Sequence, residues 1–195
     1  MKAILFVLAA ALTVLLLPVA ANHHLRNVYR QTLAHWLSKV VPPPTVFLGD
    51  SIMTRGGWFD DLRNINLASN GLVTEQVAEG LALARAYHPK HIVIMAGMND
   101  AIRGYDAERI QSVWKTICEE PRIVVTLVSP SEDDGINRKI DQLNRIASDS
   151  CQGRPVVALD VADEHGRLKQ EFAADRIHLG RRGYDQWVAK LKDLP

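Results

Sequence analysis

The sequence has 195 residues, of which 47% are hydrophobic and 23% are charged, a composition typical of one globular domain with a sizeable core. The formal net charge of +1 provides no strongly basic surface, so nucleic acid is not an expected partner. The two cysteines, Cys118 and Cys151, lack the Cys-x-x-Cys spacing of a structural zinc site, and no metal is expected.

The first 21 residues predict an export segment. The stretch from Ala3 to Ala21 carries no charge and follows a single lysine. The small residues Val19-Ala20-Ala21 suit cleavage by a signal peptidase, and the run is also about long enough to span a bilayer. A cleaved signal peptide and an uncleaved anchor both remain open. Either one predicts an exported protein, periplasmic or secreted, and an anchor would attach it to the membrane through residues 3–21.

Residues 22–44 predict an amphipathic helix followed by a proline-rich lead-in. Apolar side chains recur every three or four residues, which is the pattern of one helix face: Leu25, Val28, Tyr29, Leu33, Trp36, Leu37 and Val40. We expect this stripe to pack on the domain, although contact with a membrane is the alternative. Pro42-Pro43-Pro44 ends the helix.

From residue 45 to residue 195, predicted strands and helices alternate in a single domain. Apolar runs predict strands at 45–48, 65–68, 91–96, 123–128 and 156–161. Apolar stripes predict helices at 73–87, 106–119, 136–148 and 183–194. Alternation of this kind indicates an α/β fold with a parallel sheet covered on both faces. We therefore expect a three-layer α/β/α sandwich with a five-stranded sheet in flavodoxin-like order.

This fold brings distant polar residues together at one edge of the sheet. Ser51, Gly71 and Asn99 each follow a predicted strand, and ligands bind beyond the carboxyl ends of such strands. Asp175 and His178 lie three residues apart before the last helix, so they share a face of one turn. We expect Ser51 to be the nucleophile, His178 its general base and Asp175 the group that orients the imidazole. The backbone N–H groups of Ser51 and Gly71, with the Asn99 amide, are the expected oxyanion donors.

The motifs that carry these residues are Gly49-Asp50-Ser51, Gly71, Gly97-x-Asn99-Asp100 and Asp175-x-x-His178. In this order they resemble the four blocks of the SGNH (GDSL) hydrolase family, from about Thr45 to the C-terminus. The resemblance implies a three-layer α/β fold, no cofactor, and hydrolysis of carboxylic esters or thioesters. Its Ser, Gly, Asn and His correspond to Ser51, Gly71, Asn99 and His178, and its acid to Asp175. Ile52 stands where many members have Leu.

The expected function is that of an exported serine esterase that works through an acyl-enzyme. Lysophospholipids, acyl thioesters, short-chain esters and carbohydrate O-acetyl groups all remain open, so the expected partner is a small-molecule, lipid or saccharide ester. Two other classes compete with this interpretation. One is a metal-dependent phosphoesterase using Asp50, Asp100, Asp175 and His178; the other is a carbohydrate-binding module without catalysis.

Structural roles also compete with catalytic ones. Ser51 and Asp175 suit helix caps, and Asn99 suits a turn. Joint placement at one rim with a histidine favours catalysis instead. Asp50 and Asp100 are expected to hold the loops, and the run 160–165 is expected to be a solvated loop. Residues that flank the motifs are candidates for shaping the pocket: Met53, Arg55, Trp58, Leu72, Met98 and Ile102.

Cys118 and Cys151 are expected to form a disulfide. Each lies near the end of a predicted helix that precedes a strand, so both belong to the edge opposite the catalytic residues. Export places them in an oxidising compartment, where two cysteines in an otherwise cysteine-free chain tend to pair.

Overall fold

The computed structural model describes residues 32, 35–56 and 64–192, and its centre is a five-stranded parallel sheet. The strands lie in the order β2-β1-β3-β4-β5, and every neighbouring pair is parallel. Their bounds are β1 Thr45–Gly49, β2 Ile65–Asn66, β3 His91–Met95, β4 Ile123–Thr126 and β5 Val156–Val157. The predicted flavodoxin-like sheet is confirmed.

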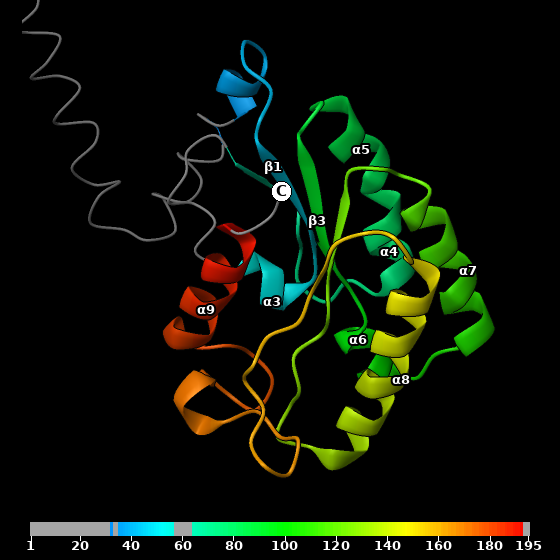
Figure 1. Ribbon diagram of the computed structural model, residues 1–195, viewed down its shortest axis with the longest axis vertical. Helices are drawn as coiled ribbons and strands as arrows, with labels where there is room; N and C mark the ends of the chain where they lie inside the picture. The colour runs from blue at the N-terminus through cyan, green and yellow to red at the C-terminus, as the bar shows by residue number, and fades with distance from the viewer. Residues whose placement is uncertain (1–31, 33–34, 57–63, 193–195) are drawn as a thin grey trace, which may run out of the picture.

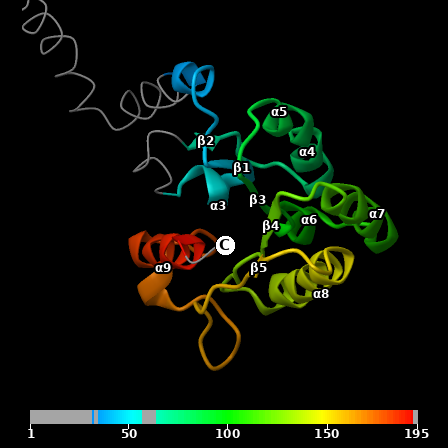
Figure 2. The same ribbon diagram turned by 45° about the horizontal axis from the view of Figure 1, so that its top comes forward.

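Helices cover both faces of this sheet. They are α3 Ser51–Thr54, α4 Thr74–Glu79, α5 Leu81–Ala86, α6 Met98–Arg103, α7 Ala107–Cys118, α8 Asp134–Ser150 and α9 Arg181–Lys192, with a 3-10 turn η2 at Gln170–Phe172. Helices α4, α5, α7 and α8 lie on one side of the sheet, and α3 and α9 lie on the other (Figures 1 and 2). The predicted three-layer sandwich is confirmed.

The central strands are continuous apolar runs because both of their faces are covered. Ile92, Val93, Ile94 and Met95 in β3 are each fully buried, as expected of a strand between two helical layers. Strand β1 pairs with β3 along its whole length, from Thr45 opposite His91 to Gly49 opposite Met95. The carboxyl ends of β1 and β3 therefore meet at the same edge.

The helix from 106 to 119 was predicted to within a residue. Asp106 caps α7 by accepting hydrogen bonds from the backbone N–H groups of Glu108 and Arg109. The same arrangement at Asp133 starts α8 at Asp134, two residues before the predicted start. A side-chain carboxylate at the N-cap satisfies backbone donors that have no partner within the helix.

The prediction of one helix over 73–87 is wrong, because the segment is divided at Gly80 into α4 and α5. A Cβ at Gly80 would lie 2.8 Å from Leu48 Cδ2, so this residue allows close contact with strand β1. The short helix α6 was not predicted either. Its six residues follow Gly97, whose φ of 134° is a conformation that favours glycine.

Strands β4 and β5 end earlier than predicted because side chains replace the neighbouring strand. Asn144 accepts a hydrogen bond from the Val128 N–H and donates one to its carbonyl. Gln186 does the same for the backbone of Asp160. Polar side chains therefore provide the hydrogen-bond partners of the backbone beyond the ends of both strands.

The predicted disulfide between Cys118 and Cys151 is confirmed. Cys118 ends α7 and Cys151 follows α8, and both residues are buried. The bridge ties together two neighbouring helices of one layer.

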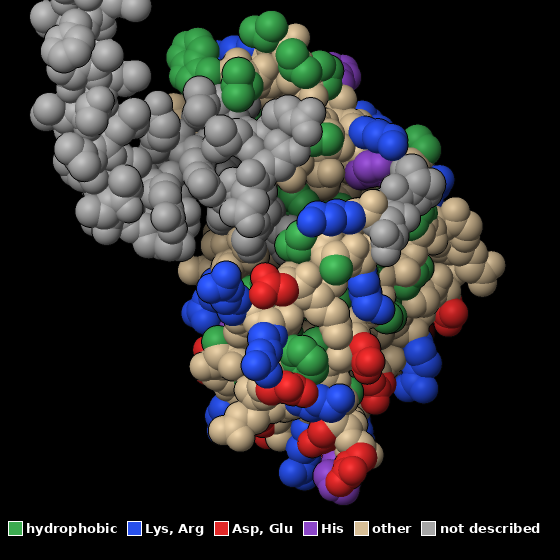
Figure 3. Space-filling model, turned by 60° about the vertical axis from the view of Figure 1, so that its left-hand side comes forward, with side chains coloured by type: hydrophobic (Ala, Val, Ile, Leu, Met, Phe, Trp, Pro, Cys, Tyr) green, Lys and Arg blue, Asp and Glu red, His purple; other side chains and the backbone are tan. Residues whose placement is uncertain are grey.

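Residues 35–42 touch the domain through the His35–Tyr87 hydrogen bond of 2.9 Å, but much of the predicted apolar stripe is exposed there, and packing of the rest of residues 22–44 stays a prediction. Residues 35–38 are helical, and Trp36, Leu37, Val40 and Val41 are exposed by 61%, 41%, 83% and 58%. Figure 3 shows hydrophobic side chains gathered at the end of the molecule where residues 35–42 lie. The predicted export segment at 3–21 lies outside the described residues. Among residues 32, 35–56 and 64–192, no helix is both long and apolar enough to cross a membrane.

Candidate active site

Ser51 lies at the carboxyl end of strand β1, where it begins the short helix α3. Asp50 caps this helix, because its Oδ1 accepts a hydrogen bond of 2.9 Å from the Ile52 N–H. A Cβ at Gly49 would lie 2.8 Å from both Met53 Cβ and the Met95 carbonyl oxygen. The close packing at Gly49 and the cap at Asp50 fix the position of the serine at the edge of the sheet.

Asp175 and His178 lie in a tight turn before helix α9. The turn is closed by an antiparallel bridge between Ala173 and Leu179 and by a 2.8 Å hydrogen bond from the Ala174 N–H to the His178 carbonyl. Asp175 Oδ1 accepts hydrogen bonds from the backbone N–H groups of Ile177 (3.0 Å) and His178 (2.9 Å). The carboxylate is therefore held in one orientation by its own loop.

The three predicted catalytic side chains form a continuous hydrogen-bonded chain. His178 Nδ1 lies 2.8 Å from Asp175 Oδ2, and Nε2 lies 2.9 Å from Ser51 Oγ. Since an ionised carboxylate only accepts, Nδ1 donates to Asp175 and Nε2 accepts from the serine hydroxyl. This tautomer is the one that a general base acting on Ser51 requires.

Asp175 is ionised at neutral pH. Partial burial raises its pKa, but hydrogen bonds from the backbone of His178 and Ile177 and from the His178 ring outweigh this and hold the pKa well below its usual range. Arg55 Nη1 approaches Oδ2, the oxygen that also accepts from His178, at 3.4 Å. The Asp175 side chain is 49% exposed and that of His178 is 16% exposed, so solvent reaches the acid more easily than the base.

The two other predicted oxyanion donors lie at the same edge. Gly71 has a φ of +78°, and Asn99 lies in the first turn of α6. Asn99 Nδ2 donates to the Leu72 carbonyl at 3.0 Å and lies 3.4 Å from Asp50 Oδ2. These contacts join the loops that carry Ser51, Gly71 and Asn99. Donation by Gly71 and Asn99 to an oxyanion stays a prediction.

These motifs belong to one established sequence pattern. The model of the GDSL-like Lipase/Acylhydrolase family matches residues 47–186, which include Ser51, Gly71, Asn99, Asp175 and His178. The chain belongs to this family. It is therefore an ester-hydrolysing enzyme, and the resemblance seen in its sequence motifs is confirmed.

Solved structures of a GDSL-like lipase and of other ester hydrolases share the fold of this one. A GDSL-like lipase from Bacteroides thetaiotaomicron has a TM-score of 0.68 at 22% identity, covering 84% of this chain and 95% of its own. The lipase/acylhydrolase from Enterococcus faecalis has a TM-score of 0.58 at 19% identity, covering 76% and 93%. An acetylxylan esterase from Geobacillus stearothermophilus, in a catalytic mutant, has a TM-score of 0.57 at 17% identity, covering 75% and 91%. No match was found among curated proteins.

Asp50 and Asp100 hold the loops of this GDSL hydrolase, as expected. Asp50 is fully buried, and burial raises its pKa to about 6 despite the hydrogen bond from Ile52. Asp100 Oδ2 accepts hydrogen bonds from the backbone and hydroxyl groups of Thr74, although burial raises its pKa as well. Each carboxylate therefore has its own partners within the protein. Across the described part of the chain, no three His, Cys, Asp or Glu side chains are grouped so as to hold a metal ion.

Sequence reasoning missed Tyr184, which connects the two ends of the hydrolase domain. Its buried hydroxyl donates to the Ile52 carbonyl at 2.7 Å and so fixes helix α9 against α3. Its spacing to Trp187 on one helix face indicated burial, but no signal indicated its partner. Of the residues expected to shape the pocket, Met53 and Met98 are instead buried in the core, and Trp58 lies outside the described residues.

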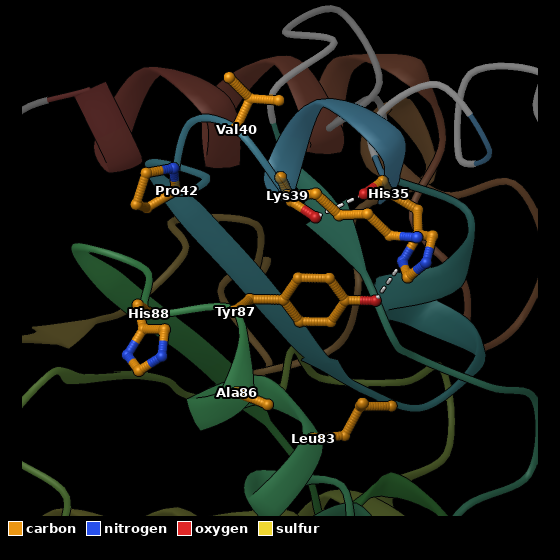
Figure 4. A pocket seen from close by; sticks show the side chains of 9 residues that line it. His35, Lys39, Val40, Pro42, Leu83, Ala86, Tyr87 and His88 are labelled. Carbon is orange, nitrogen blue, oxygen red and sulfur yellow. Dashed lines mark hydrogen bonds between the residues drawn. The ribbon is translucent and has the colours of Figure 1, made fainter.

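A separate cavity lies away from the catalytic residues. It has a volume of about 440 Å³ and is formed by residues 35–42, by α5 and by Tyr87 and His88, which follow α5 (Figure 4). His35 and Tyr87 share a hydrogen bond of 2.9 Å in its wall. No predicted catalytic or oxyanion residue lines this cavity, so it is not the site of ester hydrolysis.

Proposed function

We propose that this protein is an exported serine esterase that hydrolyses carboxylic esters or thioesters through an acyl-enzyme. The observation that carries the proposal is the unbroken contact from Ser51 through His178 to Asp175, with distances of 2.9 Å and 2.8 Å. A serine hydroxyl has little nucleophilicity of its own, and an oriented neighbouring base is what activates it.

In the proposed first step, Ser51 Oγ attacks the carbonyl carbon of the ester while His178 Nε2 takes the hydroxyl proton. Asp175 stabilises the imidazolium that forms. The N–H groups of Ser51 and Gly71 and the amide of Asn99 donate to the negatively charged oxygen. The intermediate collapses as His178 returns the proton to the leaving alcohol or thiol. Water then attacks the acyl-enzyme by the same route, which releases the acid and restores Ser51.

Several substrate classes fit this reaction. Lipases and an acetylxylan esterase are among the proteins with the same fold, so fatty-acyl and carbohydrate O-acetyl esters are both reasonable substrates. The compact chain of 195 residues leaves little room for lid insertions, which favours small or exposed acyl groups. The proposal of export depends on the uncharged stretch from Ala3 to Ala21.

The experiment is a panel of p-nitrophenyl esters of increasing acyl length, assayed with the wild type and with Ser51→Ala. Replacing the nucleophile should lower kcat by several orders of magnitude and leave only the contribution of binding and the oxyanion donors. Ser112→Ala is the matched control, because Ser112 is an exposed serine on α7.

A fluorophosphonate probe provides an independent readout, since it labels an activated serine covalently. Labelling of the wild type and of Ser112→Ala, but not of Ser51→Ala, is expected. Activity of Ser51→Ala within tenfold of the wild type would refute the serine mechanism. Loss of activity in chelator, without fluorophosphonate labelling, would favour a metal-dependent phosphoesterase instead.

A further inference from the structure

Arg103 lies beside the predicted oxyanion donors. It is the last residue of α6, four residues after Asn99, so both side chains project from the same face of that helix. Its Nη2 lies 3.3 Å from the position that a Cβ on Gly71 would occupy. The guanidinium therefore lies directly against Gly71.

The charge of Arg103 has no acidic partner within residues 35–56 and 64–192. The nearby acids are used elsewhere: Asp100 binds Thr74, Glu75 binds Arg109, and Asp106 caps α7. Several other arginines of the described chain are ion-paired, such as Arg55 with Asp175 and Arg167 with Asp134, and what distinguishes Arg103 from an unpaired surface arginine is its contact with Gly71. Arg103 is exposed, so a ligand can reach it.

The guanidinium could donate to the oxyanion or bind an anionic group of the substrate, and its position distinguishes these two roles. Arg103 lies on the Cα side of Gly71, at the place of a missing side chain, whereas the predicted oxyanion donor is the N–H of that residue. An anion held by Arg103 would thus lie on the Cα side of Gly71 and not at the N–H that is predicted to donate to the oxyanion. A guanidinium presents several donors in one plane, which suits carboxylate and phosphate groups.

We propose that Arg103 binds an anionic group of the substrate, and that the preferred substrates are esters with a carboxylate or phosphate close to the scissile bond. This inference rests on the proposed esterase function and adds a substrate class to it. The anion belongs either to the acyl part or to the alcohol part of the ester, and two pairs of substrates distinguish these cases.

The test compares charged esters with neutral esters of similar shape, using the full-length chain. Mono(4-nitrophenyl) glutarate and methyl 4-nitrophenyl glutarate differ in charge on the acyl side. The pair 4-acetoxybenzoate and 4-acetoxybenzamide differ in charge on the alcohol side. Each is assayed with the wild type, Arg103→Gln, Arg103→Lys and the control Arg145→Gln, which removes another exposed arginine, on α8.

In at least one pair, the wild type should prefer the charged ester. Arg103→Gln should then lower kcat/KM for that ester about tenfold, mainly through KM, because the lost contact is made to the bound substrate as well as to the transition state. The neutral ester should change less than twofold. Arg103→Lys should recover part of the preference, and Arg145→Gln should retain all of it.

Equal losses on the charged and neutral esters would overturn the inference, because they would make Arg103 a donor to the oxyanion. An unchanged kcat/KM for all four esters in Arg103→Gln would overturn it too, while leaving the esterase function in place. If the wild type hydrolysed none of the four esters and none of the p-nitrophenyl panel, the proposed function itself would fail, and this inference with it.

Discussion

Asp50 is the residue whose titration the structure predicts most directly. Its side chain is fully buried next to the nucleophile, and burial raises its pKa from 3.8 to about 6. An acid with a raised pKa in the folded state binds more protons there than in the unfolded state. The stability that depends on Asp50 should therefore be highest at low pH and fall as the pH rises from about 4 to about 6.

The size of this effect follows from the two pKa values. The difference between 3.8 and about 6, at about 1.36 kcal/mol per pH unit, corresponds to about 3 kcal/mol of unfolding free energy. Between pH 4.5 and 7.5, about two-thirds of this change is accessible, or about 2 kcal/mol. Solvent does not weaken this effect, because the Asp50 side chain is 0% exposed.

Asp50→Asn is the variant that isolates this contribution. An asparagine retains the oxygen that accepts from the Ile52 N–H but does not titrate. Other carboxyl groups also make the stability depend on pH. Hydrogen bonds from Arg122 and Arg85 lower the pKa of Glu120 to about 2, so its protonation in acid destabilises the protein. This loss is the same in the wild type and in the variant. The difference between wild type and variant therefore reports on Asp50 together with its electrostatic interaction with Asp100.

The assay is urea unfolding of both proteins at pH 4.5, 6.0 and 7.5, followed by circular dichroism. Relative to Asp50→Asn, the wild type should lose about 2 kcal/mol of unfolding free energy between the lowest and the highest pH. A difference between the two proteins that stays constant within about 0.5 kcal/mol across this range would refute the assignment of a raised pKa.

Three further variants test other parts of the structure. Asn99→Ala should lower kcat about a hundred- to a thousandfold if the amide donates to the oxyanion; a raised KM with kcat intact would make it a substrate-binding residue instead. Cys118→Ser opens a loop with a sequence separation of 33, so unfolding free energy should fall by about 3.7 kcal/mol in the chain-entropy model, while kcat of the folded enzyme is retained; an unchanged melting temperature would contradict this. Tyr184→Phe leaves the buried Ile52 carbonyl without its donor, which should cost about 1 to 3 kcal/mol in urea unfolding, and a smaller loss would show that this contact is not needed to hold α9.

The sequence predicted those parts of the fold that depend on local pattern. The apolar runs of β1 and β3 and the capping aspartate of α7 carry their own signals, so these elements were identified nearly to the residue. The division of α4 from α5 at Gly80 was not predicted, and the contact of Gly80 with Leu48 joins residues that lie far apart in the chain, so no local pattern indicates it. The early ends of β4 and β5 were missed for the same reason, since Asn144 and Gln186 replace strand partners from a distance.

In the candidate site, too, residues in local motifs could be predicted, whereas residues that act through distant contacts could not. Ser51, Asp175 and His178 could be predicted to lie together because each stands in a short motif at the end of an element, and the structure brings them into contact. Tyr184 and Arg103 stand in no such motif. Their importance comes from what they touch, Ile52 in one case and Gly71 in the other, and those neighbours appear only once the chain has folded.

The separation of the proposed nucleophile from its proposed base in the chain has a consequence for biosynthesis. Ser51 and His178 are 127 residues apart, and Tyr184, which fixes the last helix, follows the base. A ribosome that has released the chain only as far as β5 carries the serine but neither the histidine nor the helix that positions it. Under the proposed mechanism, the partly made protein lacks its general base, and activity begins when the final turn and α9 dock. Proteolysis between residues 157 and 173 that released this C-terminal segment would return the enzyme to the same inactive state.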